Sequence, residues 1–278
     1  MHDRYLLLGG NVLSSPTPKM MNAAFEALGL NATYTASSVG AMQLASCFAK
    51  LKAGGVKGLN VTIPHKSAMT RLLTSMDEVS TRIAAVNTVH REGKSYRGYN
   101  TDVDGIVEPL KSRGISKIGR AFVVGTGGAA RAFCEAMNRL HCGQMVALSR
   151  DPARAAGFAA SMSGAFPEIK IEVRRVDEPT GPNPELLFNA SPAGANGIPI
   201  PRQLTTLLKG KPIVFDAVYS PVKTELIAMA EELKCPTVCG YEMLLFQAAS
   251  AIQVWTNRDP PVERMKKVLL ESLGGLAP

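Results

Sequence analysis

The sequence predicts an α/β fold arranged in two halves, and three observations lead to this prediction. The 278 residues are 46% hydrophobic, which is enough to bury one large core or two modest ones. Short apolar segments alternate with segments of helical periodicity in each half, and this order indicates largely parallel sheets. In the second half, a glycine-rich turn joins an apolar segment to a helical one, and it reads Gly125-Thr126-Gly127-Gly128.

The first half begins with the apolar run YLLLG, which is typical of a short buried strand. A helical pattern then ends at Gly29, and glycine commonly ends helices. The segment AVNTVHREGKSYRGYN contains two strand-like runs around a glycine turn, so it predicts a β-hairpin over 85–99. The other elements expected in this half are strands at 5–9, 32–39 and 57–62, and helices at 18–29 and 41–53.

The alternation resumes near residue 120, where the run RAFVV predicts a strand. Two loops rich in proline and glycine, at 178–185 and 191–199, separate the later elements. We expect the junction between the two domains near 103–115. The elements expected in this half are strands at 120–124, 144–148, 185–188 and 212–216, a helix at 128–140, and helical structure at 241–274.

The charge of the chain limits the kinds of partner that we expect. It has 31 Lys and Arg residues against 23 Asp and Glu residues, for a net charge of +8 at pH 7. The cationic residues are dispersed, and no basic run is interleaved with aromatic residues, so nucleic acid is not an expected partner. The positive balance is compatible with an anionic small-molecule substrate or with a basic, solvated surface.

The sequence indicates neither a membrane nor an oxidising compartment. No apolar run approaches the roughly 20 residues that cross a bilayer, and the first residues lack the pattern of a signal peptide. We therefore expect a cytoplasmic protein. Cys235 and Cys239 are separated by three residues, and no histidine follows at zinc-finger spacing. We expect the five cysteines to be reduced, buried thiols and expect no metal site.

The turn at 125–128 has the features of a dinucleotide-binding site. The first glycine permits a tight turn, the second lets the backbone approach a pyrophosphate, and the helix N-terminus offers N–H groups to the phosphates. Ala130 stands where the usual pattern has its third glycine, and Gly128 is an additional glycine. A plain strand-to-helix turn is the alternative, but the order of strand, turn and helix favours the nucleotide. The cofactor contacts expected here are Gly125, Thr126, Gly127, Gly128 and Ala129.

The end of the following strand should lie near the adenosine ribose of the cofactor. An acidic residue there favours NAD, whereas arginine favours NADP because it pairs with the 2′-phosphate. The sequence reads Ser149-Arg150-Asp151, with Arg154 one turn further on. We therefore predict NADP, with Ser149, Arg150 and Arg154 as cofactor contacts. We interpret Asp151 as the N-cap of a helix that begins at Pro152.

Three segments of the first half are unusually polar for strand ends, and they are 14–18, 60–66 and 100–102. Lys66, just after a strand and a proline turn, is a candidate acid or base. Asp102, in another loop, could hold this lysine and tune its proton affinity. The alternative is that these residues are helix caps and a surface lysine.

Seven motifs of the chain occur in the order and spacing of the shikimate dehydrogenase family, which the chain resembles over about residues 5–270. They are NVTIPHK, AAVNT, GYNTDVDG, VVGTGGAARA, NASPAG, FDAVYSP and GYEMLLFQA. The resemblance implies reduction of 3-dehydroshikimate to shikimate with NADPH, in aromatic amino-acid biosynthesis. It also implies two α/β domains with the active site in the cleft between them. The expected parts are a substrate domain at 1–103, a Rossmann-like NADP-binding domain at 104–239, and C-terminal helices at 240–278 that pack back on the first domain.

The resemblance further implies roles for residues that match positions of the family motifs. Lys66 matches the catalytic lysine, which exchanges a proton with the reacting oxygen, and Asp102 matches its partner in the dyad. The residues that match substrate-binding positions are Ser15, Thr17, Thr62, Asn87, Tyr219 and Gln247. The residues that match positions around the nicotinamide and its ribose are Asn189, Ser191 and Met243.

The chain also departs from the family pattern. Ser14 replaces a histidine of the first motif, Thr17 replaces its second serine, and Met21 replaces a histidine that usually precedes Asn22. The cofactor-side motif Asn-Arg-Thr is Ser-Arg-Asp here. These differences leave open a quinate or quinate/shikimate dehydrogenase that uses NAD.

A third hypothesis is a non-catalytic, metabolite-binding regulator, because the fungal quinate repressor resembles this family. It predicts damage to the dyad or to the glycine turn, and the sequence retains both. The partner that we expect is a small-molecule substrate. We expect a monomer or a homodimer, with no membrane association.

Overall fold

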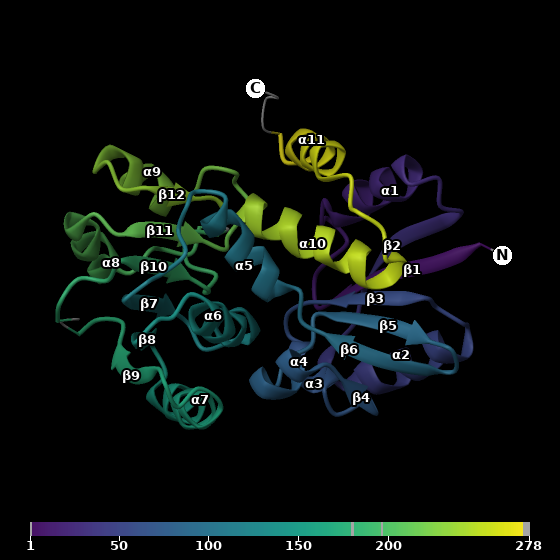
Figure 1. The fold of residues 1–278 in the computed structure, drawn as a ribbon, viewed down its shortest axis with the longest axis horizontal. Coiled ribbons are helices and arrows are strands. Elements are labelled where there is room, and N and C mark those ends of the chain that lie inside the picture. The colour runs from purple at the N-terminus through teal and green to yellow at the C-terminus, as the bar shows by residue number, and fades with distance from the viewer. Residues whose placement is uncertain (1, 179–180, 196, 275–278) are drawn as a thin grey trace. The chain divides into compact units, whose positions relative to one another are not determined.

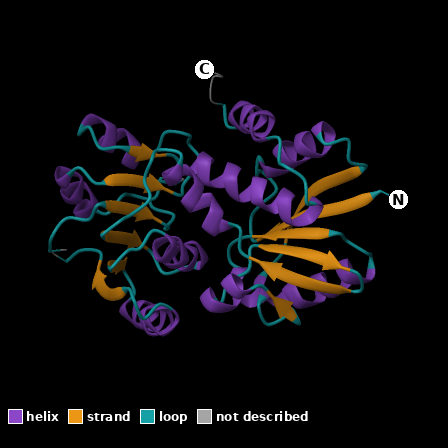
Figure 2. Cartoon of the chain, viewed as in Figure 1, coloured by secondary structure: helices purple, strands orange, loops and turns teal. Residues whose placement is uncertain are grey.

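The computed structural model describes residues 2–178, 181–195 and 197–274 (Figure 1). Parts of the loops expected at 178–185 and 191–199 therefore lie outside the described residues. The chain divides into two compact units, one formed by Met1–Asp102 and Leu245–Pro278 and the other by Val103–Leu244. Each unit contains a six-stranded sheet with helices on both faces (Figure 2). The predicted α/β class is confirmed.

The sheet of the first unit is formed by β1 (Asp3–Gly9), β2 (Ala32–Ser38), β3 (Gly58–Val61), β4 (Ser75–Met76), β5 (Thr88–Glu92) and β6 (Ser95–Tyr99). Its strand order is β2-β1-β3-β5-β6-β4. β1 pairs in parallel with β2 and β3, as the alternation of strands and helices predicts. β5 is antiparallel to β6, with which it forms the expected hairpin, and it is also antiparallel to β3.

The helices of the first unit are α1 (Thr17–Ala27), α2 (Leu44–Ala53), α3 (Lys66–Met69), α4 (Glu78–Ile83), the part of α10 (Gly240–Thr256) that follows Leu244, and α11 (Val262–Ser272). A 3₁₀ turn, Ala41–Gln43, forms the start of the helix that was expected at 41–53. Helical structure was expected over 241–274, and the structure has two helices there, α10 and α11, separated by residues 257–261. The chain leaves the helix at Asn257, which has a φ of 52°, and Pro260 and Pro261 prevent the helix from resuming before Val262.

Residue alternation along the strands separates the two faces of this sheet. Tyr5 and Gly58 are register partners, and both face Trp255 of α10. The Trp255 ring centroid lies 4.8 Å from that of Tyr5, and its Nε1 donates a hydrogen bond of 3.0 Å to the Val89 carbonyl. These contacts attach α10, near the end of the chain, to a sheet whose strands all come from its first 99 residues.

The opposite face of the sheet is apolar and packs against α2. Leu59, Val61 and Val89 belong to one buried cluster with Phe48 of α2. Phe48 also meets Tyr96 edge-on, with ring centroids 5.7 Å apart. This face therefore forms the first unit's second core layer.

The sheet of the second unit is formed by β7 (Arg120–Val124), β8 (Gln144–Ser149), β9 (Lys170–Arg175), β10 (Leu186–Asn189), β11 (Ile213–Asp216) and β12 (Thr237–Val238). Its order is β12-β11-β10-β7-β8-β9, and every pair is parallel. This is the doubly wound order of Rossmann-like folds. β9 was not predicted, because its charged residues lie on a half-exposed edge strand and give no apolar run.

The helices of the second unit are α5 (Asp102–Lys111), α6 (Gly128–Arg139), α7 (Pro152–Ala165), α8 (Arg202–Leu207) and α9 (Glu225–Glu232), and α10 begins here. The region 103–115, where a domain junction was expected, is largely occupied by α5. On one side of the sheet, Phe188 stacks on Phe133 of α6 with ring centroids 4.7 Å apart. On the other side, Val214 and Leu187 pack with Leu226 of α9.

The strand order reverses between β7 and β10, since the chain runs outward from β7 through β8 to β9 and then returns to β10 beside β7. Ligands of doubly wound folds bind outside the carboxyl ends of the strands at such a switch point. The glycine turn follows β7 at this place, and the NASPAG segment begins at the last residue of β10. The fold therefore brings two of the predicted cofactor segments to the same edge of the sheet.

The cysteines are all free thiols. Cys134, Cys142 and Cys235 are buried, whereas Cys47 and Cys239 are only half-buried, so the expectation of burial is wrong for those two. The described segments contain no group of three or more His, Cys, Asp or Glu residues placed to hold a metal ion. None of the helices in the described part of the chain has both the length and the apolar character needed to cross a membrane.

Substituting Gly58 tests the packing of α10 on the first sheet. In Gly58→Ala the new Cβ would lie 2.6 Å from Trp255 Nε1 and 2.8 Å from Tyr5 Cδ1. We expect a loss of about 1–3 kcal/mol in the free energy of unfolding, because both rings must shift. Urea unfolding followed by the fluorescence of Trp255, the one tryptophan of the chain, measures this loss.

The matched control is Gly157→Ala in α7, where a new Cβ meets nothing within 4 Å. We expect this variant to gain about 0.5–1 kcal/mol, because alanine favours the helix over glycine. Circular dichroism follows both variants. Equal stability of Gly58→Ala and the wild type would show that α10 is not packed on Gly58 as described.

Candidate functional site

The polar residues of the first unit meet around an ion pair between Lys66 and Asp102. Lys66 begins α3, and Asp102 is the first residue of α5. Lys66 Nζ lies 2.5 Å from Asp102 Oδ2. The side chain of Lys66 is 14% exposed and that of Asp102 only 4%. The pair therefore presents a lysine that a ligand can reach, held from behind by a buried carboxylate.

Asn87 supplies the second partner of the Asp102 carboxylate. Its Nδ2 donates to Asp102 Oδ1 at 2.8 Å and lies 3.3 Å from Gln247 Oε1 of α10. Each carboxylate oxygen thus has a donor, which a buried charge requires. The structure brings together Lys66, Asp102, Asn87 and Gln247, four residues that the sequence singled out.

A chain of buried polar groups fixes the orientation of the Asn87 amide. Its Oδ1 accepts hydrogen bonds from the Thr101 N–H at 2.7 Å and from the Thr88 hydroxyl at 2.9 Å, so Nδ2 must face Asp102. The Thr88 hydroxyl in turn accepts from Asn60 Nδ2 at 3.0 Å, and Asn60 Oδ1 accepts from the Tyr34 hydroxyl at 2.8 Å. Burial raises the pKa of Tyr34 well above its ordinary value, so this hydroxyl remains a donor.

Thr88 and Tyr34 were not predicted as site residues, and Thr101 was noted only as part of the polar segment 100–102, although all three are buried members of this chain. A signal was present. Asn60 and Thr88 are register partners on adjacent strands, and Asn60 is a polar residue between the apolar Leu59 and Val61. Without the strand register, however, the sequence does not show that they point to the same face.

Ser15 and Thr17 form a second polar group in this unit. The Ser15 hydroxyl donates to Thr17 Oγ1 at 3.0 Å and accepts from the Thr17 N–H at 3.3 Å. Both hydroxyls lie at the N-terminus of α1, which begins at Thr17. Hydroxyls combined with a helix N-terminus suit an anionic group such as a carboxylate.

Thr62 directly follows β3, and its N–H donates to the Leu8 carbonyl at 2.8 Å. Its side chain is half-buried. Among the described residues, no hydrogen bond joins Thr62 or the Ser15–Thr17 pair to the Lys66–Asp102 pair. Asn87 with its partners, the Ser15–Thr17 pair and Thr62 all lie in the first unit. Of these, only Asn87 and its partners are hydrogen-bonded to the Lys66–Asp102 ion pair.

The glycine turn of the second unit is an open cradle at the start of α6. Gly125 has a φ of 102°, and a Cβ there would lie 3.3 Å from the Ala190 carbonyl. Gly127 is the N-cap without a side-chain hydrogen bond, and a Cβ on it would meet nothing within 4 Å. Thr126, Gly128 and Ala129 are half-buried. The cradle fits a dinucleotide pyrophosphate, because no side chain caps the N-terminus of α6 and its first N–H groups can bind the phosphates.

The residues after β8 include the predicted cap of α7 and three predicted cofactor contacts. Asp151 Oδ1 accepts a hydrogen bond of 3.1 Å from the Arg154 N–H, so its predicted role as the N-cap of α7 is confirmed. The Ser149 hydroxyl donates to the Asp151 carbonyl at 3.2 Å. Arg150 and Arg154 are exposed, so their guanidinium groups are accessible to an anionic ligand.

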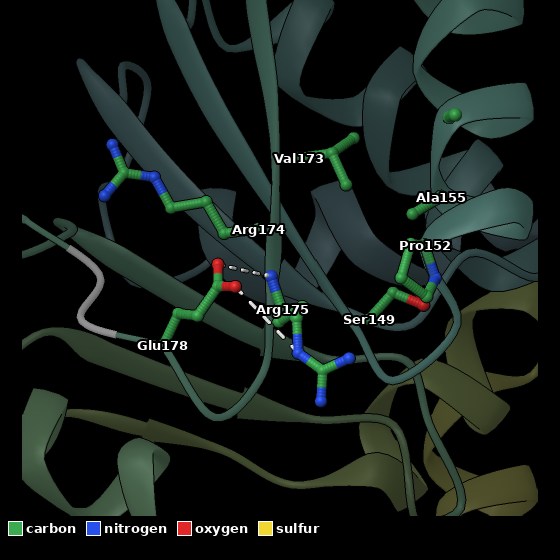
Figure 3. A pocket seen from close by; sticks show the side chains of 8 residues that line it. Ser149, Pro152, Ala155, Val173, Arg174, Arg175 and Glu178 are labelled. Atoms are coloured by element: carbon green, nitrogen blue, oxygen red, sulfur yellow. Dashed lines mark hydrogen bonds and ion pairs between the residues drawn. The ribbon is translucent and has the colours of Figure 1, made fainter.

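A pocket of about 290 Å³ adjoins Ser149. Figure 3 shows Pro152 and Ala155 on one side of it and Val173 with Arg174 and Arg175 on the other. Glu178 accepts a hydrogen bond of 3.3 Å from the Arg175 N–H. The apolar wall and cationic rim lie at the carboxyl end of β8, where an adenosine is expected.

Four more predicted residues belong to the second unit. Asn189 ends β10, and its Oδ1 accepts from the Ser191 hydroxyl at 2.7 Å and from the Ser191 N–H at 3.1 Å. Tyr219 is half-buried in the turn after β11, and Met243 is buried in the first turn of α10. The structure therefore joins Asn189 to Ser191 directly.

Comparison with known proteins identifies the group to which this arrangement belongs. Residues 7–89 match the shikimate dehydrogenase substrate binding domain, and residues 240–270 match the shikimate 5′-dehydrogenase C-terminal domain. The chain is 38% identical to the NADP(+) shikimate dehydrogenase of Moorella thermoacetica, over 96% of this chain and 92% of that protein.

Solved structures agree with this comparison. The shikimate 5-dehydrogenase of Thermus thermophilus, in complex with NADP(H) and shikimate, is 28% identical with a TM-score of 0.84, covering 98% of this chain and 100% of that one. The quinate dehydrogenase of Corynebacterium glutamicum, in complex with NAD, is 27% identical with a TM-score of 0.87, covering 97% and 99%.

The sheet of the second unit and its glycine cradle define an α/β protein of the dinucleotide-binding type, and the first unit carries a Lys–Asp pair. The sequence identity to shikimate dehydrogenases over nearly the whole chain narrows this class of protein to one family. The chain belongs to the shikimate dehydrogenase family.

The hydroxyl of Thr88 offers a test of the buried polar chain. Thr88→Val removes the hydroxyl through which the Asn60 and Asn87 side chains are linked, and it leaves a buried donor and a buried acceptor short of a partner. We expect a loss of about 1–3 kcal/mol in the free energy of unfolding, measured by urea denaturation. Thr88→Ser keeps the hydroxyl and should lose less, about 1 kcal/mol. A valine variant as stable as the serine variant would contradict this account.

Proposed function

We propose that this chain is an NADP-dependent shikimate dehydrogenase, which reversibly reduces 3-dehydroshikimate to shikimate in aromatic amino-acid biosynthesis. The observation that carries the proposal is the Lys66–Asp102 pair with Asn87 behind it, in a chain that also has an open dinucleotide cradle. The two intact sites favour catalysis over a role as a metabolite-binding regulator. The protein would act in the cytoplasm, as a monomer or homodimer.

Lys66 is the proposed acid and base. In the reduction, its Nζ gives a proton to the substrate oxygen as the carbonyl becomes a hydroxyl, and in the oxidation it takes that proton back. Asp102 keeps Nζ in place through the 2.5 Å contact and accepts a hydrogen bond from the same substrate hydroxyl. Asn87 fixes Asp102 from the other oxygen, so the dyad does not have to reorganise during the reaction.

The remaining polar residues would orient a polyhydroxylated carboxylate. Ser15 and Thr17 at the N-terminus of α1 have the chemistry to bind the substrate carboxylate. The residues proposed to bind the ring hydroxyls or carboxylate are Thr62, Asn87, Tyr219 and Gln247. Such a substrate needs several hydroxyl and amide partners, which these residues supply.

NADPH, when bound, supplies the hydride. The proposed pyrophosphate site is the backbone of the turn from Gly125 to Ala129, where the uncapped start of α6 supports this assignment. Arg150 and Arg154 would pair with the 2′-phosphate, next to Ser149 and the pocket of Figure 3. Asn189, Ser191 and Met243 are proposed to surround the nicotinamide and its ribose.

A quinate or quinate/shikimate dehydrogenase that uses NAD is the second candidate. Thr17 supports it, because threonine keeps the hydroxyl of the family's serine but adds a methyl group beside the proposed carboxylate site. The exposed carboxylate of Asp151 supports NAD, because it would repel a 2′-phosphate. The similarity to a quinate dehydrogenase with NAD is consistent with this candidate.

An assay that crosses shikimate and quinate with NADP+ and NAD+ tests the proposal. We expect the highest kcat/KM for shikimate with NADP+. Arg150→Ala should lower kcat/KM with NADP+ by roughly tenfold or more, and change it little with NAD+, because one charge-assisted contact to a phosphate is worth about 1.5–3 kcal/mol. Faster turnover of quinate with NAD+ by the wild type would instead establish the second candidate.

The acid–base role of Lys66 has its own test. We expect Lys66→Ala to lower kcat by roughly a hundredfold or more, because one positioned acid is lost. The dissociation constant for NADPH, measured by fluorescence titration, should stay within about twofold, since Lys66 lies outside the cradle. The control Lys111→Ala removes an exposed lysine of α5 and should keep the wild-type kcat. Near-wild-type kcat in Lys66→Ala would refute the assignment.

A further inference from the structure

The carboxyl group of Asp216 is a buried acid that the proposed mechanism does not use. It ends β11 and is completely buried. Three donors surround it: Asn189 Nδ2 at 2.9 Å, the Val218 N–H at 3.0 Å and the Thr224 hydroxyl at 2.7 Å. In the described part of the chain, no lysine, arginine or histidine forms an ion pair with it. Burial raises the pKa of this carboxyl group above its ordinary value.

One of its oxygens acts on the loop after β10. Asp216 and Asn189 are register partners at the ends of β11 and β10. Asp216 Oδ1 accepts from Asn189 Nδ2, which turns Asn189 Oδ1 toward the hydroxyl and N–H of Ser191. Asn189 Nδ2 also donates to the Ala193 carbonyl at 2.9 Å. The carboxylate therefore orients the amide that folds the whole 189–193 loop.

The same oxygen acts on the turn after β11. Asp216 Oδ1 accepts a hydrogen bond from the Val218 N–H, and this bond folds the turn back onto the end of β11. Tyr219 is the next residue of the turn. From the other side, Gly240 at the start of α10 contacts the turn so closely that a Cβ would collide with the Val218 carbonyl. The turn is thus held between the carboxylate and the N-terminus of α10.

The loop after β10 lies at the switch point of the sheet, beside the glycine cradle, and the turn after β11 follows the neighbouring strand. A Cβ on Gly125 would lie 3.3 Å from the Ala190 carbonyl, so the loop after β10 is packed on the cradle. Asn189, Ser191 and Tyr219 are residues of these loops to which the proposed function gives a role in binding. The Asp216 side chain is hydrogen-bonded to both loops, next to the backbone hydrogen bond of 3.0 Å from the Ala217 N–H to the Asn189 carbonyl.

We propose that Asp216 is a positioning residue for hydride transfer, whose carboxylate holds the 189–193 loop and the 216–219 turn in the arrangement that orients the nicotinamide end of the cofactor. The inference rests on the proposed function. Its chemistry requires no change in covalent bonding, because Asp216 acts through Asn189 and Val218 and does not touch the reactants.

Three variants separate positioning from stability. Asp216→Ser shortens the side chain so that it no longer reaches Asn189 and leaves room for water to solvate the donors. Asp216→Asn keeps an oxygen toward Asn189 and Val218 and turns its NH₂ group toward the Thr224 hydroxyl, which can accept. Thr224→Val is the control, because it removes a hydroxyl that bonds Asp216 and caps α9 but leaves both loop contacts intact.

The readout is kcat with shikimate and NADP+, divided by the concentration of sites that bind NADPH in a fluorescence titration. We expect Asp216→Ser to lower kcat per binding site by roughly tenfold or more, because a small misorientation of reacting groups is costly. Asp216→Asn should stay within about threefold of the wild type. Thr224→Val should unfold at a lower temperature but keep kcat per binding site within about twofold.

Unchanged kcat per binding site in Asp216→Ser would overturn the inference, as would an equal loss in Thr224→Val. If Asp216→Ser yields no folded protein, Asn189→Ala breaks the same link from the other loop. It must then lower kcat per binding site to a similar degree, and a wild-type value would overturn the inference. A wild type that does not oxidise shikimate with NADP+ would instead refute the proposed function.

Discussion

The burial of the Asp102 carboxylate governs the arrangement of the first unit's polar residues. A carboxylate removed from water needs a partner for each oxygen, and Lys66 and Asn87 meet this need from different elements. Asn87 can do so only with its amide in one orientation, which Thr101 and Thr88 impose. Lys66, Asn87 and Asp102 therefore connect α3, the residue just before β5 and the start of α5. Lys66, on the exposed side of the ion pair, is held in place by these contacts.

In the second unit, the main constraint is that backbone segments approach one another closely at the carboxyl edge of the sheet. Glycine stands at Gly125 and Gly240 because the neighbouring carbonyls of Ala190 and Val218 leave little or no room for a side chain. These contacts pack the loops at the carboxyl edge of the sheet, while Gly127 leaves the start of α6 open. Because the surrounding loops are closely packed, they cannot move over the N-terminus of α6. The N–H groups there stay accessible to an anion at one defined position.

Much of this organisation could be read from the sequence, and the failures have physical reasons. Buried parallel strands such as RAFVV are continuous apolar runs, so they were found, and the capping role of Asp151 followed from its place before Pro152. The edge strand β9 was missed because its charged residues hide the alternating period, and the division at 257–261 was not located because the C-terminal helices were predicted only as helical structure over 241–274. Lys66 and Asp102 stood out as polar residues at strand ends, whereas Thr88 and Asp216 act through register partners on neighbouring strands, which no local pattern reveals.

The seat of Trp255 on the first sheet also bears on the order in which the chain is completed during synthesis. The indole and its acceptor, the Val89 carbonyl, are 166 residues apart, and all of the second unit lies between them. Residues 103–244 emerge from the ribosome as one uninterrupted stretch, and they can close their sheet while α10 is still being made. The strands translated first must keep the Tyr5–Gly58 face uncovered during that time. This face of the first sheet is therefore covered by Trp255 only after the second unit has been made, whereas the opposite face can pack on α2 before that.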